Sequence, residues 1–92
     1  MIVRIATEDQ YELADEHATR LNELDNAIVD AVRAGNDRTF RELLGEMLSL
    51  VRDKGQVLDG DDLRESEVIL PPPDITLEEA AEEFSGEGLI PG

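Results

Sequence analysis

Apolar residues recur at helical spacing through the middle of this chain, and the series is broken once, at Gly35. Leu21, Leu24 and Ile28 begin the series. Successive helical residues lie about 100° apart, so these side chains gather on one face of a helix. Glycine readily adopts the left-handed conformation that ends helices. We therefore predict a helix over roughly residues 15–34 that ends just before this glycine.

A second helix follows after a short connection. Asn36 or Asp37 can cap it by accepting hydrogen bonds from its first backbone N–H groups, and the apolar spacing stops near Gly55. The apolar residues between these limits are Phe40, Leu43, Leu44, Met47, Leu48, Leu50 and Val51. They span an arc of roughly 160°, wider than the ~100° stripe of a helix with one packed face. We expect this helix to pack against the first helix and also against a sheet or a partner molecule, which leaves self-association open.

Short extended segments flank the helical pair. Ile2, Val3 and Ile5 form a β-branched run and residues 10–13 a second short extended stretch, with the polar residues 7–9 between them. Both stretches are too short for helices, so we predict a hairpin. A third strand is expected near residues 67–70. It ends at the three prolines 71–73, which lack N–H donors and form a rigid corner.

A last helix begins at Thr76, because Glu79 stands three residues later and the two form a capping box. Its expected apolar residues are Leu77, Ala80, Ala81 and Phe84. Together these segments predict one α+β domain over residues 1–92. It consists of a small antiparallel sheet, made of the N-terminal hairpin and the third strand, packed with a helical hairpin and a short C-terminal helix.

The charge of the chain narrows the class of partner. Asp and Glu number 23 against eight Lys and Arg, for a formal net charge of −15. Nucleic acids and anionic membrane surfaces are bound through Lys and Arg, so neither is expected as a partner. A basic protein surface is the natural complement. A solubilising surface and adaptation to a salty cytoplasm are alternative explanations of the same composition.

The chain lacks cysteine and has no apolar run near the ~20 residues of a membrane span. We expect a cytoplasmic protein without direct membrane insertion. A 92-residue domain has a thin core, which leaves little volume for an enclosed active site.

No residue pattern indicates catalysis or a bound cofactor. His17 lacks a positioned nucleophile and further metal ligands, and we interpret it as a solvated helix-surface residue. The carboxylates of residues 59–67 resemble a calcium loop, but its sixth and twelfth positions hold Arg64 and Leu70 instead of Gly and Glu. We predict no catalytic, cofactor-binding or metal site. A ligand- or ion-responsive regulatory domain that uses this segment as its sensor is the alternative function.

Several segments, spread over nearly the whole chain, carry a resemblance to a known family. They are Met1-Ile2-Val3-Arg4-Ile5, Gln10-Tyr11-Glu12-Leu13, Leu21-Asn22-Glu23-Leu24-Asp25, Val68-Ile69-Leu70-Pro71-Pro72 with Asp74, Thr76-Leu77-Glu78-Glu79 and Gly88-Leu89-Ile90-Pro91-Gly92. In these segments and their order the chain resembles the PspAA family, small proteins associated with the phage-shock-protein A (PspA) membrane-stress system. The resemblance implies a non-enzymatic, cytoplasmic adaptor or regulator of a PspA-type coiled-coil protein, recruited through that partner to the inner face of the membrane.

With such a partner, an acidic helix and an apolar tail become candidate contacts. The candidate residues are Glu78, Glu79, Glu82, Glu83, Leu89 and Ile90. We expect the four glutamates to steer association with a basic amphipathic surface and the two apolar residues to add contact area. The alternative for the two apolar residues is that they fold back onto the core of the domain.

Overall fold

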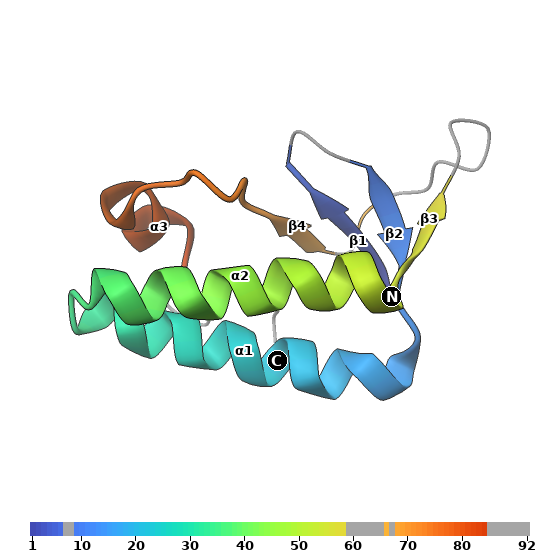
Figure 1. Ribbon diagram of the computed structural model, residues 1–92, viewed down its shortest axis with the longest axis horizontal. Helices are drawn as coiled ribbons and strands as arrows, with labels where there is room; N and C mark the ends of the chain where they lie inside the picture. The colour runs from blue at the N-terminus through green and yellow to red at the C-terminus, as the bar shows by residue number, and fades with distance from the viewer. Residues whose placement is uncertain (7–8, 59–65, 67, 85–92) are drawn as a thin grey trace.

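The computed structural model describes residues 1–6, 9–58, 66 and 68–84 of the chain (Figure 1). Within these residues the elements, in chain order, are β1 (Ile2–Ile5), β2 (Gln10–Glu12), α1 (Asp15–Arg33), α2 (Asp37–Lys54), β3 (Gln56–Leu58), β4 (Val68–Leu70) and α3 (Leu77–Glu83). A sheet and helices therefore combine in one chain, and the predicted α+β class is confirmed.

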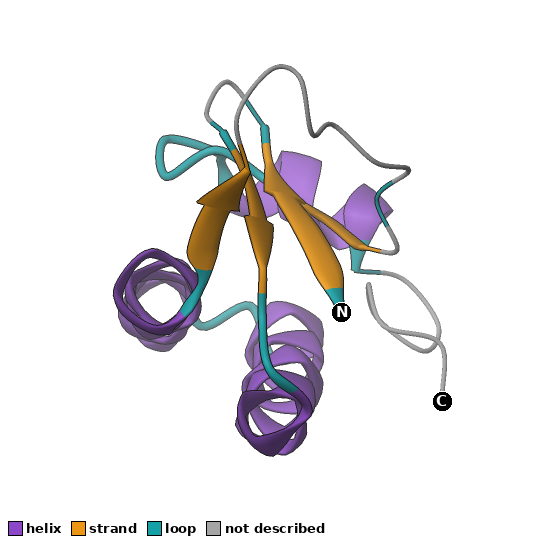
Figure 2. Cartoon of the chain, turned by 90° about the vertical axis from the view of Figure 1, so that its right-hand side faces the viewer, coloured by secondary structure: helices purple, strands orange, loops and turns teal. Residues whose placement is uncertain are grey.

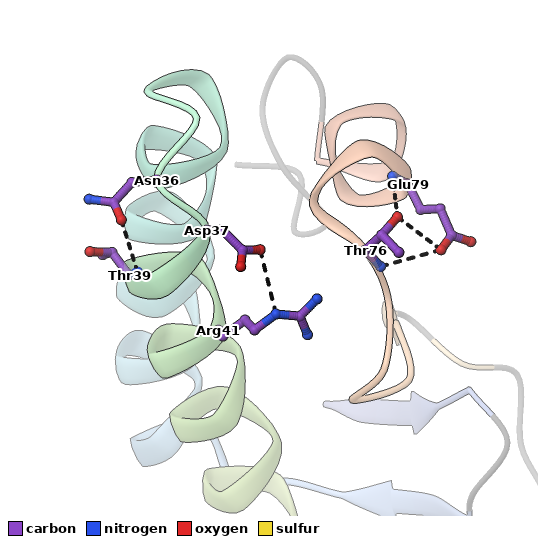
Figure 3. A network of polar contacts seen from close by, with 6 residues as sticks. All are labelled: Asn36, Asp37, Thr39, Arg41, Thr76 and Glu79. Atoms are coloured by element: carbon purple, nitrogen blue, oxygen red, sulfur yellow. Dashed lines mark hydrogen bonds and ion pairs between the residues drawn. The ribbon is translucent and has the colours of Figure 1, made fainter.

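The helical hairpin is located where the apolar spacing predicts it. Gly35 has φ 69°. The N–H of Asn36 donates to the carbonyl of Ala31 at 2.9 Å, and the N–H of Gly35 donates to that of Val32 at 3.0 Å, the pattern of a Schellman motif. Asn36 then caps α2, because its side-chain oxygen accepts the N–H of Thr39 at 3.1 Å (Figure 3). Two adjacent residues thus end one helix and start the next.

The sheet is mixed, with the strand order β3-β2-β1-β4. β1 pairs antiparallel with β2, as the hairpin prediction requires. β4 pairs parallel with β1, with Val3 opposite Val68 and Ile5 opposite Leu70, so the expectation of an antiparallel third strand is wrong. The side-chain pattern of a short strand is the same in both directions. The direction depends on the long connection that brings the chain to the far edge of the sheet.

β3 lies just after Gly55, in a segment for which the sequence pattern predicts no strand. Gln56 and Val57 are exposed and Leu58 is only half-buried, so this strand lacks the alternation that identifies a half-buried strand. It forms because the chain leaves α2 at Gly55 directly beside β2, where Tyr11 pairs with Val57. Proximity to an existing strand, rather than local propensity, makes this segment a strand.

One core joins the helices to the sheet. Figure 2 shows α1 and α2 on the same side of the sheet. The strand residues that face them are buried: Val3, Ile5, Tyr11, Val68 and Leu70. The buried residues of α2 belong to the same core: Phe40, Leu44, Met47, Leu48 and Val51. α2 packs against α1 as predicted, and its Phe40 also contacts Phe84 at the end of α3.

α3 packs at the end of the helical hairpin that lies away from the sheet (Figure 1). After β4, the N–H of Ile75 donates to the carbonyl of Pro72 at 3.2 Å and closes a turn. The predicted capping box is present: the N–H of Glu79 donates to Thr76 Oγ1 at 3.1 Å, and the N–H of Thr76 donates to Glu79 Oε1 at 3.3 Å (Figure 3). The position of α3 is therefore set by a turn, a cap and its own buried face.

Candidate protein-binding surface

Charge is distributed unevenly along the chain. α2 contains four acidic and four basic residues, whereas α3 contains four glutamates and no basic residue. Residues 55–92 contain eleven of the 23 acidic residues but only one of the eight basic ones. The negative charge is therefore concentrated in the part of the chain that includes β4 and α3.

The helical hairpin carries ion pairs that compensate its charges locally. The pairs include Arg38 with Glu42 at 3.4 Å, Arg41 with Asp37 at 3.5 Å (Figure 3) and, between the two helices, Arg20 with Glu46 at 3.6 Å. All six side chains are largely exposed, so these pairs contribute little to stability. They do make the outer surface of α2 electrically balanced, and a balanced surface produces a weak steering field.

α3 presents the predicted glutamates to solvent. The exposed residues of this helix are Glu78, Glu79, Ala81, Glu82 and Glu83. Ala80 and Phe84 are buried, and the Phe84 ring meets Phe40 of α2 edge-to-face, with 6.4 Å between ring centroids and 77° between planes. The expectation that Ala81 lies on the apolar side is wrong. In so short a helix, Ala80 and Phe84 stack one turn apart and point the next residue outward.

The glutamates of α3 repel one another within the helix. Glu78 and Glu82 are four residues apart, as are Glu79 and Glu83, and like charges at this spacing destabilise a helix. The last turn of α3 has acidic side chains and no basic one, which opposes the helix dipole. A basic partner surface would relieve both effects. This surface is therefore suited to a cationic partner.

Two buried polar residues add internal structure that the sequence reasoning missed. Asp25 is fully buried on α1 and makes an intramolecular interaction. Its spacing from Leu21 and Ile28 places it on the apolar face of that helix, so the apolar pattern already contained the signal. Gln10 is also buried, and its Nε2 donates to Ser66 Oγ at 2.6 Å. Gln10 and Ser66 are 56 residues apart, so no local sequence pattern could predict their hydrogen bond.

The remaining candidates of the sequence analysis are His17, the calcium-loop segment and the apolar tail. The His17 side chain is 28% exposed, and its Nε2 lies 3.7 Å from Glu16 Oε1, so it lies on a partly covered helix surface. Among the residues that the structure describes, no group of three or more His, Asp or Glu side chains could hold a metal ion. Leu89 and Ile90, and every carboxylate of residues 59–67, lie outside the described residues, so their roles remain predictions.

None of the helices in the described ranges has the length and hydropathy needed to cross a bilayer.

Comparison with protein-family models finds a match to PspAA, described as PspA-Associated protein, over residues 1–92. Comparisons with curated proteins and with solved structures found no significant match.

Proposed function

Because the chain belongs to the PspAA family of PspA-associated proteins, matched over residues 1–92, we propose that it is a non-enzymatic adaptor or regulator that binds a PspA-type coiled-coil protein. The family match carries this proposal, since it associates the chain with the PspA system along its whole length. Within the membrane-stress response, the protein would change the state of its partner by occupying a surface of it. It would need no reaction centre for this role.

The acidic face of α3 supports the proposal as the first contact with the partner. Its backbone is held at one end by the Thr76–Glu79 capping box and at the other by Phe84 against Phe40. A surface that is ordered before binding loses less conformational entropy when the partner docks. Four glutamates on such an element produce a local negative field that accelerates encounter with a basic helix surface.

The charge of the chain also determines how it would reach a membrane. A formal net charge of −15 is repelled by the anionic lipids of a cytoplasmic leaflet. We propose that the protein acts in the cytoplasm and is brought to the inner face of the membrane by its partner.

The experiment measures association of the full chain with a PspA-type coiled-coil protein, by stopped-flow fluorescence over a range of salt concentrations. The test variant combines Glu78→Lys, Glu82→Lys and Glu83→Lys with Glu79→Gln. Glutamine at position 79 preserves the capping box. We expect the association rate constant at low salt to fall at least about tenfold, and its dependence on salt to flatten, because the steering field is removed.

A control variant with the same net charge separates the α3 surface from total charge. It combines Glu23→Lys, Asp30→Lys and Glu42→Lys with Glu46→Gln, all on exposed positions of α1 and α2. This control should associate much faster than the α3 variant. Equal association rate constants for the two variants would show that α3 is not part of the binding surface. If the unmodified protein does not bind at all, the proposed adaptor function is wrong.

A further inference from the structure

The sheet has a second face, which points away from the two long helices (Figure 2). Side chains alternate along each strand, so the residues between the core-facing ones lie on this outer face. Cross-strand pairing places one residue from each strand in a single row across it: Leu58, Gln10, Arg4 and Ile69. Residues that are far apart in the sequence therefore lie side by side.

The two halves of this row differ in exposure. On β2, Gln10 is 4% exposed and is bonded to Ser66, and Leu58 beside it on β3 is half-buried. On β1 and β4, Arg4 is exposed and Ile69 is 58% exposed. The chain thus covers the half of the row on β3 and β2 and leaves the half on β1 and β4 open.

The two exposed side chains of this row, Arg4 and Ile69, are unusual for this protein. In the described part of the chain, Ile69 and Val57 are the two large apolar side chains that are more than half exposed. Arg4 forms no ion pair with any described residue, whereas the arginines at 20, 38 and 41 each have a carboxylate partner. An exposed guanidinium can accept a carboxylate from a partner as a bidentate pair. Arginine is enriched at the centres of protein interfaces, and an exposed apolar side chain beside it adds area that a partner can bury.

The arrangement favours a helix over a strand as the occupant. An added strand at the β4 edge would bond to backbone groups, but Pro71 follows this three-residue strand and has no N–H to donate. The face of the sheet offers side chains instead. A helix lying across it can place an acidic and an apolar side chain, three or four residues apart, on neighbouring strands.

We propose that Arg4 and Ile69 form a docking site for one helix of the coiled-coil partner, which places an acidic side chain on the guanidinium and an apolar side chain on Ile69. This inference rests on the proposed function. β4 leads through the proline corner directly into α3, along the same side of α2 (Figure 1). The longest extent of the molecule is 40 Å, which a helix covers in roughly 27 residues. A partner helix of this length would be long enough to span the distance between this site and the glutamates of α3.

Isothermal titration calorimetry with the full chain and the same PspA-type coiled-coil protein tests the site. We expect Arg4→Glu and Ile69→Ser each to weaken affinity at least about tenfold, as is usual for central interface residues. Val57→Ser is the matched control, because Val57 is 51% exposed but lies on β3 at the other edge of the sheet. It should change affinity less than about twofold. Thermal melting of each variant verifies the fold.

The possible outcomes separate this inference from the function on which it rests. If the unmodified protein binds and both Arg4→Glu and Ile69→Ser bind equally well, the docking site is wrong and the adaptor function stands. If Val57→Ser weakens binding as much as Ile69→Ser, the open half of the row has no special role and the site is also wrong. If the unmodified protein does not bind, both proposals fail.

Discussion

Replacing Gly55 by alanine should destabilise the fold, whereas the same replacement at Gly45 should stabilise it. Gly55 joins α2 to β3. A Cβ atom there would overlap the carbonyl oxygen of Val51 and would lie 3.0 Å from the Cβ of Tyr11. Neither group can move easily, because the Val51 carbonyl accepts the Gly55 N–H at 2.8 Å and Tyr11 is buried between two paired strands. The clash can be relieved only by moving the end of α2 away from β2.

The sizes of the two effects follow from their surroundings. Overpacking that forces backbone shifts costs about 1–3 kcal/mol. At Gly45, which is exposed in the middle of α2, an added Cβ would meet nothing within 4 Å. Alanine there should stabilise by about 0.5–1 kcal/mol through helix propensity. In a domain of 60–100 residues, 1 kcal/mol shifts the melting temperature by about 4–8 °C. We expect a decrease of roughly 4–24 °C for Gly55→Ala and an increase of roughly 2–8 °C for Gly45→Ala.

Circular dichroism of the two variants and the unmodified protein, during thermal and urea unfolding, measures both shifts. Equal urea m-values in the three proteins would show that the surface exposed on unfolding is unchanged, so that the differences are differences in stability. If Gly55→Ala is as stable as the unmodified protein, the Val51 carbonyl and Tyr11 do not lie close enough to Gly55 to exclude a Cβ atom. If Gly45→Ala is destabilised, its surroundings are not open.

Two further substitutions test the local signals that end and start helices. Gly35→Ala should destabilise by about 1–2 kcal/mol, because alanine is strained at φ 69°, and Gly35→Asn should lose less, since asparagine tolerates this conformation. Equal loss for both would show that the left-handed conformation is not the cause. Thr76→Ala should cost about 1 kcal/mol by removing the cap of α3, whereas Thr76→Ser should retain most of the stability. Urea unfolding measures each effect. If Thr76→Ala is as stable as the unmodified protein, the Thr76 cap does not stabilise α3.

The parts of the fold that the sequence predicted correctly depend on contacts within a few residues. Gly35 and Asn36 act on backbone groups no more than five residues away, and Thr76 and Glu79 act on each other. Such signals are complete within a short window of sequence. For the same reason the exposure of the four α3 glutamates followed from their spacing around one helix turn.

The parts that the sequence did not predict depend on where distant segments meet. β3 becomes a strand because β2 is beside it, and β4 runs parallel to β1 because of the connection that precedes it. The neighbourhood of Arg4 and Ile69 has the same origin, since they are opposite each other only through this parallel pairing. Before the register is known, Arg4 is a polar residue in a strand and Ile69 an apolar one, and nothing links them.

A partner helix that contacts both proposed sites can lie in only one direction. The glutamates of α3 require a basic group, and Arg4, on the sheet at the other end of the molecule, requires an acidic one. A helix placed in the opposite direction would bring its acidic group to α3 and its basic group to Arg4, and like charges facing each other at an interface are strongly unfavourable. Reversing Arg4 alone, or the α3 glutamates alone, should therefore weaken binding in both directions, whereas reversing both in the same molecule should restore binding with the partner helix in the opposite direction. If the double reversal binds as weakly as the single reversals, one partner helix does not contact both sites.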